Sequence, residues 1–69
     1  MNKPYDTKII PLGAIVEYSK PYPDEIGTKY KVIEIEVIES NIHCLIEAIV
    51  PMRIKPVYWA WGKELTVLS

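Results

Sequence analysis

The chain has 69 residues, of which 49% are hydrophobic and 25% are charged, and its net charge at pH 7 is −1. This length predicts one small domain, and the apolar share suffices for a core without disulfides or a structural metal. The balanced charge argues against a general nucleic-acid-binding surface, which usually carries a basic excess. A single cysteine and a single histidine supply neither an internal disulfide nor a zinc ligand set, so we expect no metal and no cofactor.

The first residues and the hydropathy of the chain suggest the cellular compartment in which we expect the protein. The first eight residues, MNKPYDTK, are polar and lack the apolar stretch of a signal peptide. No apolar run approaches the ~18 residues that a membrane span needs. We therefore expect a cytoplasmic protein without a membrane partner.

Strands dominate the prediction because isoleucine, valine and tyrosine are common and six prolines interrupt the chain. Residues 1–11 are interpreted as an N-terminal tail or lead-in and residues 12–69 as the domain. The first strand is expected at 12–18. One face of this strand would carry Leu12, Ala14, Val16 and Tyr18.

A loop at 19–27, stiffened by prolines and closed by Gly27, leads to the longest predicted strand at 29–39. The apolar pattern of that strand changes parity. Tyr30 and Val32 are on one face, whereas the next apolar residues, Ile33, Ile35 and Val37, are on the other. One extra residue in a strand reverses every following side chain, so this change predicts a bulge or sharp bend.

The remaining strands are short. Ser40-Asn41 is expected to be a tight turn, followed by strands at 42–50, 57–61 and 64–68, with Gly62-Lys63 turning the chain between the last two. One face of the 42–50 strand would enter the core, through Ile42, Cys44, Ile46, Ala48 and Val50. The fold class is therefore predicted as all-β, a small five-stranded SH3-like barrel with one long bent strand.

The segments PLGAIVEY, Gly27 and KYKVIEI resemble the opening strands of KOW-type and related small SH3-like barrels, and Glu64-Leu65 resembles the entry to their closing strand. The chain is also similar to small uncharacterised proteins of phages and mobile elements. The resemblance implies the barrel fold and leaves the function open. KOW domains tend to carry basic residues in the first loop, where this chain has Asp24 and Glu25.

Catalytic residues are not expected. His43 and Cys44 are neighbours in a predicted strand, so their side chains would point to opposite faces and would not form a nucleophilic pair. Asp24 and Glu25 are adjacent, are expected to be exposed, and have no partner that would separate their pKa values. We therefore expect that the protein is not an enzyme.

The aromatic residues provide the first candidate binding site. Tyr18, Tyr22, Trp59 and Trp61 would line a groove for a proline-rich peptide or a methylated amine, with Asp24 and Glu25 at its rim favouring a basic ligand. The alternative, which we favour, is that these residues fill the core of a chain without phenylalanine, since Val57, Trp59 and Trp61 share one face.

The second candidate site is an apolar outer face at Leu45 and Ile49, extended by Ile38 if it pairs with Leu45 across the turn. The equally weighted alternative is that Ile9 and Ile10 fold back over this face.

Three functions follow from these sites. The leading hypothesis is a non-catalytic interaction or regulatory module that binds a protein partner, which includes a second copy of this chain. The first alternative is a KOW-like nucleic-acid-binding domain that uses Lys29, Lys31, Arg53 and Lys55. The other is a phage- or plasmid-borne inhibitor of a host protein.

Overall fold

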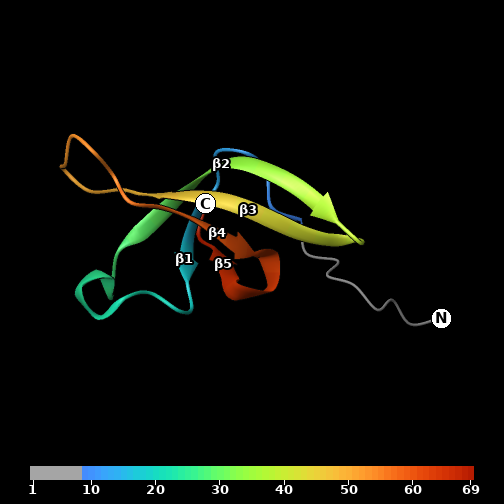
Figure 1. Ribbon diagram of the computed structural model, residues 1–69, viewed down its shortest axis with the longest axis horizontal. Coiled ribbons are helices and arrows are strands. Elements are labelled where there is room, and N and C mark those ends of the chain that lie inside the picture. Colours follow the sequence, from blue (N-terminus) through green and yellow to red (C-terminus); the bar gives the residue numbers. More distant parts are fainter. Residues whose placement is uncertain (1–8) are drawn as a thin grey trace.

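The computed structural model describes residues 9–69, so most of the predicted lead-in, residues 1–8, lies outside the described residues. The described chain is all-β, and its elements in order are β1 (Ile15–Tyr18), η1 (Pro23–Glu25), β2 (Lys29–Ile38), β3 (Asn41–Ala48), β4 (Val57–Trp61), η2 (Gly62–Glu64) and β5 (Leu65–Val67) (Figure 1). The two η elements are single turns of 3₁₀ helix. None of the helical segments in this part of the chain has the length and apolar character of a membrane span.

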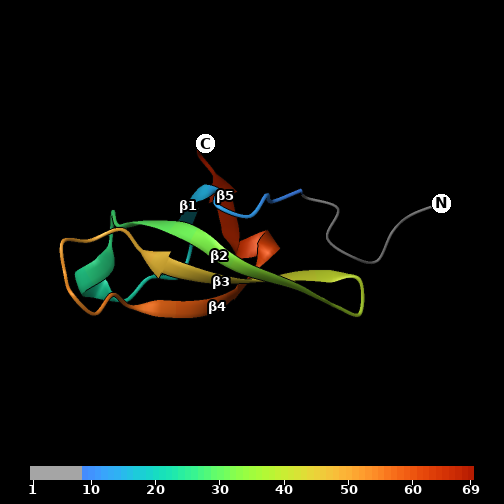
Figure 2. The same ribbon diagram turned by 90° about the horizontal axis from the view of Figure 1, so that it is seen from above.

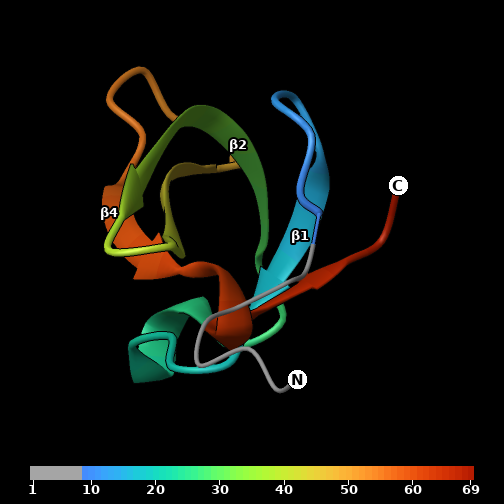
Figure 3. The same ribbon diagram turned by 90° about the vertical axis from the view of Figure 1, so that its right-hand side faces the viewer.

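The five strands form one antiparallel sheet in the order β4-β3-β2-β1-β5. Consecutive strands are neighbours except that β5 returns to pair with β1, where Val16 lies opposite Val67. The sheet is strongly curled, and β2 arches between β1 and β4 (Figure 3). Within residues 9–69, β4 and β5 are its two unpaired edges. The sheet is therefore open, and the closed barrel expected from the sequence is not confirmed.

The predicted irregularity in the long strand is present and explains its change of parity. Opposite β3, the register shifts between Val32 and Glu34, which leaves Ile33 as the extra residue of a β-bulge. Tyr30 and Val32 point into the core before the bulge and are fully buried, and Ile35 packs against the core after it. The bulge thus lets one strand keep apolar residues inward on both sides of a bend.

The turn between β2 and β3 lies one residue earlier than predicted. Ile38 pairs with Asn41, so the two turn residues are Glu39 and Ser40, with φ angles of 49° and 68°. Both angles are in the left-handed region that a type I′ hairpin turn requires at its two central residues. This register places Leu45 opposite Glu34, so the predicted pairing of Ile38 with Leu45 is wrong. The tip of this hairpin extends beyond the rest of the sheet (Figure 2).

The core lies on the concave side of the sheet. The predicted inward face of β3 is confirmed, since Cys44, Ile46 and Ala48 are buried and Ile42 and Val50 pack against the core. The other buried residues are Ile10, Ala14, Val16, Tyr30, Val32, Ala60 and Leu65.

The start of the described chain differs from one prediction, for Leu12, and from one of two equally weighted alternatives, for Ile9 and Ile10. Leu12 is 67% exposed because Gly13, at φ 87°, turns the chain before β1 begins at Ile15. Ile10 is buried in the core and Ile9 is exposed, so neither residue covers the outer face at Leu45 and Ile49. The lead-in segment therefore contributes to the core through Ile10.

Candidate functional site

The loop between β1 and β2, residues 19–28, is held to the sheet by Glu25. Its Oε1 accepts a 2.6 Å hydrogen bond from the hydroxyl of Tyr30, and its Oε2 accepts another, also 2.6 Å, from the hydroxyl of Tyr58. Pro23 begins η1, which delivers Glu25 to this position. The expectation that Glu25 is an exposed rim carboxylate is therefore wrong: it is half-buried, and both of its oxygens are engaged.

Four tyrosine rings pack around this carboxylate. Tyr18 and Tyr58 each approach Tyr30 edge to face, with ring centroids 6.2 and 6.3 Å apart, and Tyr22 lies 5.8 Å from Tyr58. These are the distances and tilts that aromatic pairs prefer. Tyrosine therefore does fill the core, but mainly through Tyr30, and the outer rings of the cluster reach solvent.

The tyrosine hydroxyls next to Glu25 are poor acids. The hydrogen bond to Glu25, followed by burial, raises the pKa of Tyr58 to about 12. Burial, followed by its own hydrogen bond to Glu25, raises the pKa of Tyr30 well above the ordinary value. Both phenols therefore remain protonated donors at neutral pH, and the cluster serves to position the loop.

A pocket of about 460 Å³ opens between this loop and β4. We call it the aromatic groove, and it is lined by Tyr18, Lys20, Pro21, Tyr22, Val57, Tyr58 and Trp59. Tyr22 is 63% exposed and Trp59 is 42% exposed, so large aromatic surfaces border the groove. The structure therefore brings together three residues predicted from the sequence, Tyr18, Tyr22 and Trp59.

Of two charged side chains near the aromatic groove, Lys20 is paired and Asp24, within residues 9–69, is not. The ammonium group of Lys20 lies 3.1 Å from Glu64 and is thus already paired. The Asp24 side chain is exposed, has no hydrogen bond or ion pair within residues 9–69, and is close enough to Tyr58 to contribute to raising its pKa. Asp24 does not line the groove itself, but it is a carboxylate near Tyr58 that remains available to a basic ligand.

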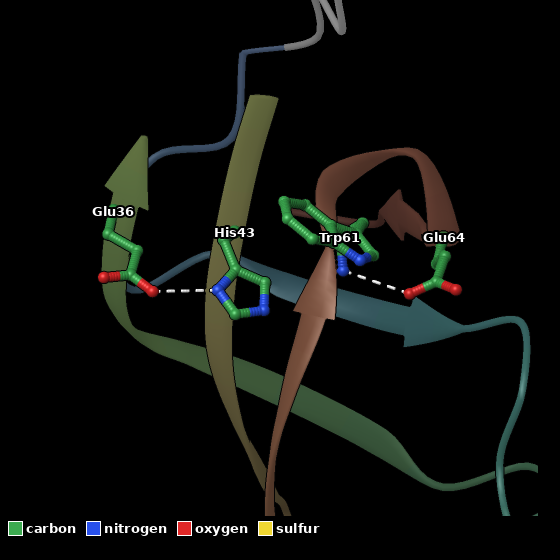
Figure 4. A network of polar contacts seen from close by, with 4 residues as sticks. All are labelled: Glu36, His43, Trp61 and Glu64. Atoms are coloured by element: carbon green, nitrogen blue, oxygen red, sulfur yellow. Dashed lines mark hydrogen bonds and ion pairs between the residues drawn. The ribbon is translucent and has the colours of Figure 1, made fainter. Parts of the chain in front are cut away.

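Trp61 lies outside the aromatic groove. It is on the outer face of the sheet, where His43 lies between Glu36 and Trp61 (Figure 4). His43 Nδ1 is 2.9 Å from Glu36 Oε2, and the His43 ring packs on both tryptophans, with centroids 4.7 Å from Trp59 and 4.4 Å from Trp61. Trp61 also borders a second pocket of about 290 Å³, together with Asn41, Ile42 and Lys63.

The prediction that Trp59 and Trp61 fill the core is thus wrong. The register decides this, because the buried residues Cys44 and Ile46 lie opposite Ala60 and Tyr58, which therefore take the inward face of β4. The sequence pattern alone does not reveal the row that His43 forms with the two tryptophans. It becomes visible only when β4 is aligned with β3, since His43 lies opposite Trp61.

The second candidate surface, at Leu45 and Ile49, is divided between β3 and the loop that follows it. Leu45 is half-buried and lies between Glu34 on β2 and Trp59 on β4. Ile49 is 50% exposed and lies beyond the end of β3, where its N–H donates to the carbonyl oxygen of Lys29. Leu45 therefore belongs to the outer face beside Trp59, whereas Ile49 belongs to the loop that follows β3.

His43 and Cys44 occupy opposite faces of β3, His43 on the outer face and Cys44 fully buried. Among residues 9–69, no three side chains of histidine, cysteine, aspartate or glutamate lie together in a way that would hold a metal ion.

The four basic residues of the nucleic-acid hypothesis are all exposed. Lys29 and Lys31 are on β2, and Lys31 lies opposite Glu47. Arg53 and Lys55 are in the 49–56 loop, where the Lys55 ammonium donates to the Met52 carbonyl oxygen at 3.0 Å. The same loop exposes Met52 and Ile54, so its surface is mixed, with cationic and apolar residues.

The chain matches no known family model, and no curated protein or solved structure is significantly similar to it.

Proposed function

We propose that this protein is a non-catalytic interaction module that binds a segment of a partner protein in the aromatic groove. The observation that carries the proposal is the groove itself: a pocket of about 460 Å³ with exposed rings from both the 19–28 loop and β4. Exposed aromatic side chains around a concave site are typical of the residues that contribute most to protein–protein binding.

The way the groove is built supports this proposal. Its loop wall is fixed through both oxygens of Glu25, and the Tyr22 ring rests on Tyr58. A wall that is already ordered loses little conformational entropy when a ligand binds. Asp24 at the rim favours a basic residue in the partner segment, because an opposite charge is available there and Lys20 is already paired.

The proposal includes the finer fold assignment, a small SH3-like barrel with incomplete closure. The bent β2 that serves both halves of the sheet supports it, as does the return of β5 to pair with β1. The backbone N–H of Ser19 donates to the carbonyl oxygen of Glu64 at 3.0 Å, which ties the start of the 19–28 loop to η2 near the open side.

Selection from a random library of displayed ten-residue peptides tests the function. We expect peptides that bind the protein and lose at least about tenfold in affinity with Trp59→Ala, because this ring borders the groove. Trp61→Ala is the matched control, since Trp61 is on the same strand and face but outside the groove. Asp24→Asn should weaken the basic peptides selectively. Circular dichroism must show that each variant is folded.

Two results of this selection would reject the proposal. One is the absence of any peptide that prefers the wild-type protein to Trp59→Ala. The other is equal loss of affinity with Trp59→Ala and Trp61→Ala in folded protein. The inhibitor hypothesis makes the same predictions for the surface and differs only in the identity of the partner.

Nucleic-acid binding is the second candidate. It is supported by Lys29 and Arg53, which are exposed and have no ion pair within residues 9–69. The carbonyl oxygen of Lys29 accepts a hydrogen bond from Ile49 at the start of the 49–56 loop, and Arg53 is in that loop. This function requires an affinity for single-stranded oligonucleotides that falls steeply with salt and is lost in Arg53→Glu. An affinity that does not change between about 50 and 200 mM salt would reject nucleic-acid binding.

A further inference from the structure

The outer edge of β4 exposes backbone groups whose direction follows from the hydrogen bonds on its inner side. The N–H of Ala48 on β3 donates to the carbonyl oxygen of Pro56 at 2.9 Å, so the backbone of Pro56 faces β3. Backbone polar groups alternate in direction along an antiparallel strand. Tyr58 and Ala60 therefore also direct theirs toward β3, whereas Val57, Trp59 and Trp61 direct theirs away from it.

Glu64 confirms this direction and protects one end of the edge. The N–H of Trp61 donates to Glu64 Oε1 at 3.0 Å, on the side away from β3 (Figure 4). Within residues 9–69, β4 pairs with β3 alone, and no hydrogen bond engages the outward N–H and C=O groups of Val57 and Trp59. These two residues thus present a short ladder of donors and acceptors.

The sequence of β4 leaves this edge unprotected. Natural sheets block their edges with charged residues, proline or bulges, and β4, with the sequence VYWAW, has none of these. Its register with β3 is regular over its whole length. An extended segment is therefore able to pair with it without opposing a charge on β4.

The unprotected edge and the aromatic groove are parts of one site. Val57 and Trp59, which carry the outward backbone groups, also line the groove, and Pro21 and Tyr22 line its other side. Figure 3 shows the 19–28 loop on the side of β4 away from β2. A peptide in the groove would consequently lie along the edge of β4.

We propose that the partner segment binds as an added β-strand along β4, hydrogen-bonded to the backbone of Val57 and Trp59. This inference rests on the proposed function and names its ligand: an extended segment of β-branched residues alternating with lysine or arginine. Alternate side chains of an added strand point to opposite faces. One set enters the groove beside Tyr22 and Tyr58, where Asp24 meets a basic group, and the other lies on the outer face beside Trp59.

Strand addition makes a backbone-dependent prediction that side-chain recognition does not make. The probe is a capped eight-residue peptide of alternating valine and arginine, with a fluorescent label, and its binding is followed by anisotropy. Two further peptides carry N-methyl groups, one on every valine and the other on every arginine. Only one of these two sets of N–H groups faces β4, so we expect one methylated peptide to bind at least about tenfold more weakly than the other.

The matching change in the protein is Val57→Pro, which removes the outward N–H and no hydrogen bond to β3. The reference is Val57→Ala, which also removes side-chain contact in the groove but keeps the N–H. We expect Val57→Pro to bind the unmethylated probe about three- to tenfold more weakly than Val57→Ala. Thermal unfolding of both variants establishes that they are folded. If Val57→Pro does not fold, the comparison of the two methylated peptides still decides the question.

Equal binding of the two methylated peptides would overturn strand addition and leave the groove function standing. If library peptides bind the groove but the valine–arginine probe does not, strand addition is also overturned and the groove function stands. If no library peptide prefers the wild-type protein to Trp59→Ala, both proposals are rejected. Analytical ultracentrifugation compares the oligomeric state of the wild type and Val57→Pro. A wild-type dimer that is a monomer in Val57→Pro would assign the edge to a second copy of the chain and would overturn the proposed occupant.

Discussion

The carboxylate of Glu25 accepts a 2.6 Å hydrogen bond from the hydroxyl of Tyr58, although the two residues are 33 positions apart in the chain. Its other oxygen accepts from Tyr30, so a single side chain in the 19–28 loop connects that loop to two strands. The loop is thereby both a turn and one wall of the aromatic groove. The stability of the groove should depend on this carboxylate more than on its neighbour Asp24.

Glu25→Gln should lower the midpoint of thermal unfolding by about 5–10 °C, because it replaces two charge-assisted hydrogen bonds with weaker ones and introduces a donor where two donors already point. Asp24→Asn is the matched control, since Asp24 has no hydrogen bond within residues 9–69, and its midpoint should be almost unchanged. Equal effects of the two changes in calorimetry would contradict the assigned role of Glu25.

Alkaline pH should destabilise the protein through the same hydroxyl groups. The pKa of Tyr58 is raised from 10.0 to about 12, and that of Tyr30 is raised as well. The unfolded chain therefore releases these protons at a lower pH than the folded chain, and stability that is present below pH 10 decreases as the pH rises toward 12. Urea unfolding of the wild type between pH 8 and 11.5 or so should show this decrease.

Tyr58→Phe provides the control for the alkaline effect. The variant should be less stable than the wild type at pH 8, because it lacks the hydrogen bond to Glu25. Its further loss of stability above pH 10 should be smaller, because one fewer tyrosine has a raised pKa. The same pH dependence in both proteins would show that Tyr58 does not contribute.

Acidic pH should act through Glu64. Burial alone would raise the pKa of this carboxylate, but the N–H of Trp61 and the ammonium of Lys20 more than compensate and hold it below its ordinary value. The resulting stability is present above about pH 4.5 and is lost as the pH falls through the lowered pKa. We expect the wild type to lose more stability between about pH 5 and 3 than Glu64→Gln, measured by urea unfolding. A parallel decrease would contradict this assignment.

The turn between β2 and β3 can be improved. Glu39 and Ser40 adopt φ angles of 49° and 68°, which asparagine and glycine tolerate better. The double change Glu39→Asn and Ser40→Gly should increase the free energy of unfolding by about 1 kcal/mol. Asn41→Gly, one residue later, should decrease it, because Asn41 is in β3 and its side chain donates to the Glu39 carbonyl oxygen. A stabilising effect of Asn41→Gly would favour the turn position expected from the sequence.

Local patterns predicted much of the fold. The change of parity after Val32 anticipated the bulge, and the alternation of β3 identified Cys44, Ile46 and Ala48 as core residues, because a strand with one buried face repeats every second residue. The exact bounds were less predictable. Leu12 fits the alternation of the first strand, but Gly13 turns the chain after it.

The candidate site was predictable only in part. Tyr18, Tyr22 and Trp59 were identified by residue type and do line one groove, but Trp61 and Glu25 have other roles. The strand VYWAW carries apolar and aromatic residues on both parities, with Tyr58 on one and Trp59 and Trp61 on the other, so its own pattern does not distinguish the inward face. The pairing with β3 makes that distinction, because Cys44 and Ile46 fix which residues of β4 lie over the core.

The sequence by itself determined that this chain forms a small all-β domain whose strands alternate around one core, since that follows from composition and from the two-residue period of a strand. Tertiary structure alone decided that Glu25 is clamped between Tyr30 and Tyr58, and that β4 presents an unpaired edge beside an aromatic groove. Both depend on residues far apart in the chain, and their proximity arises from strand register and sheet curvature, which no local pattern encodes.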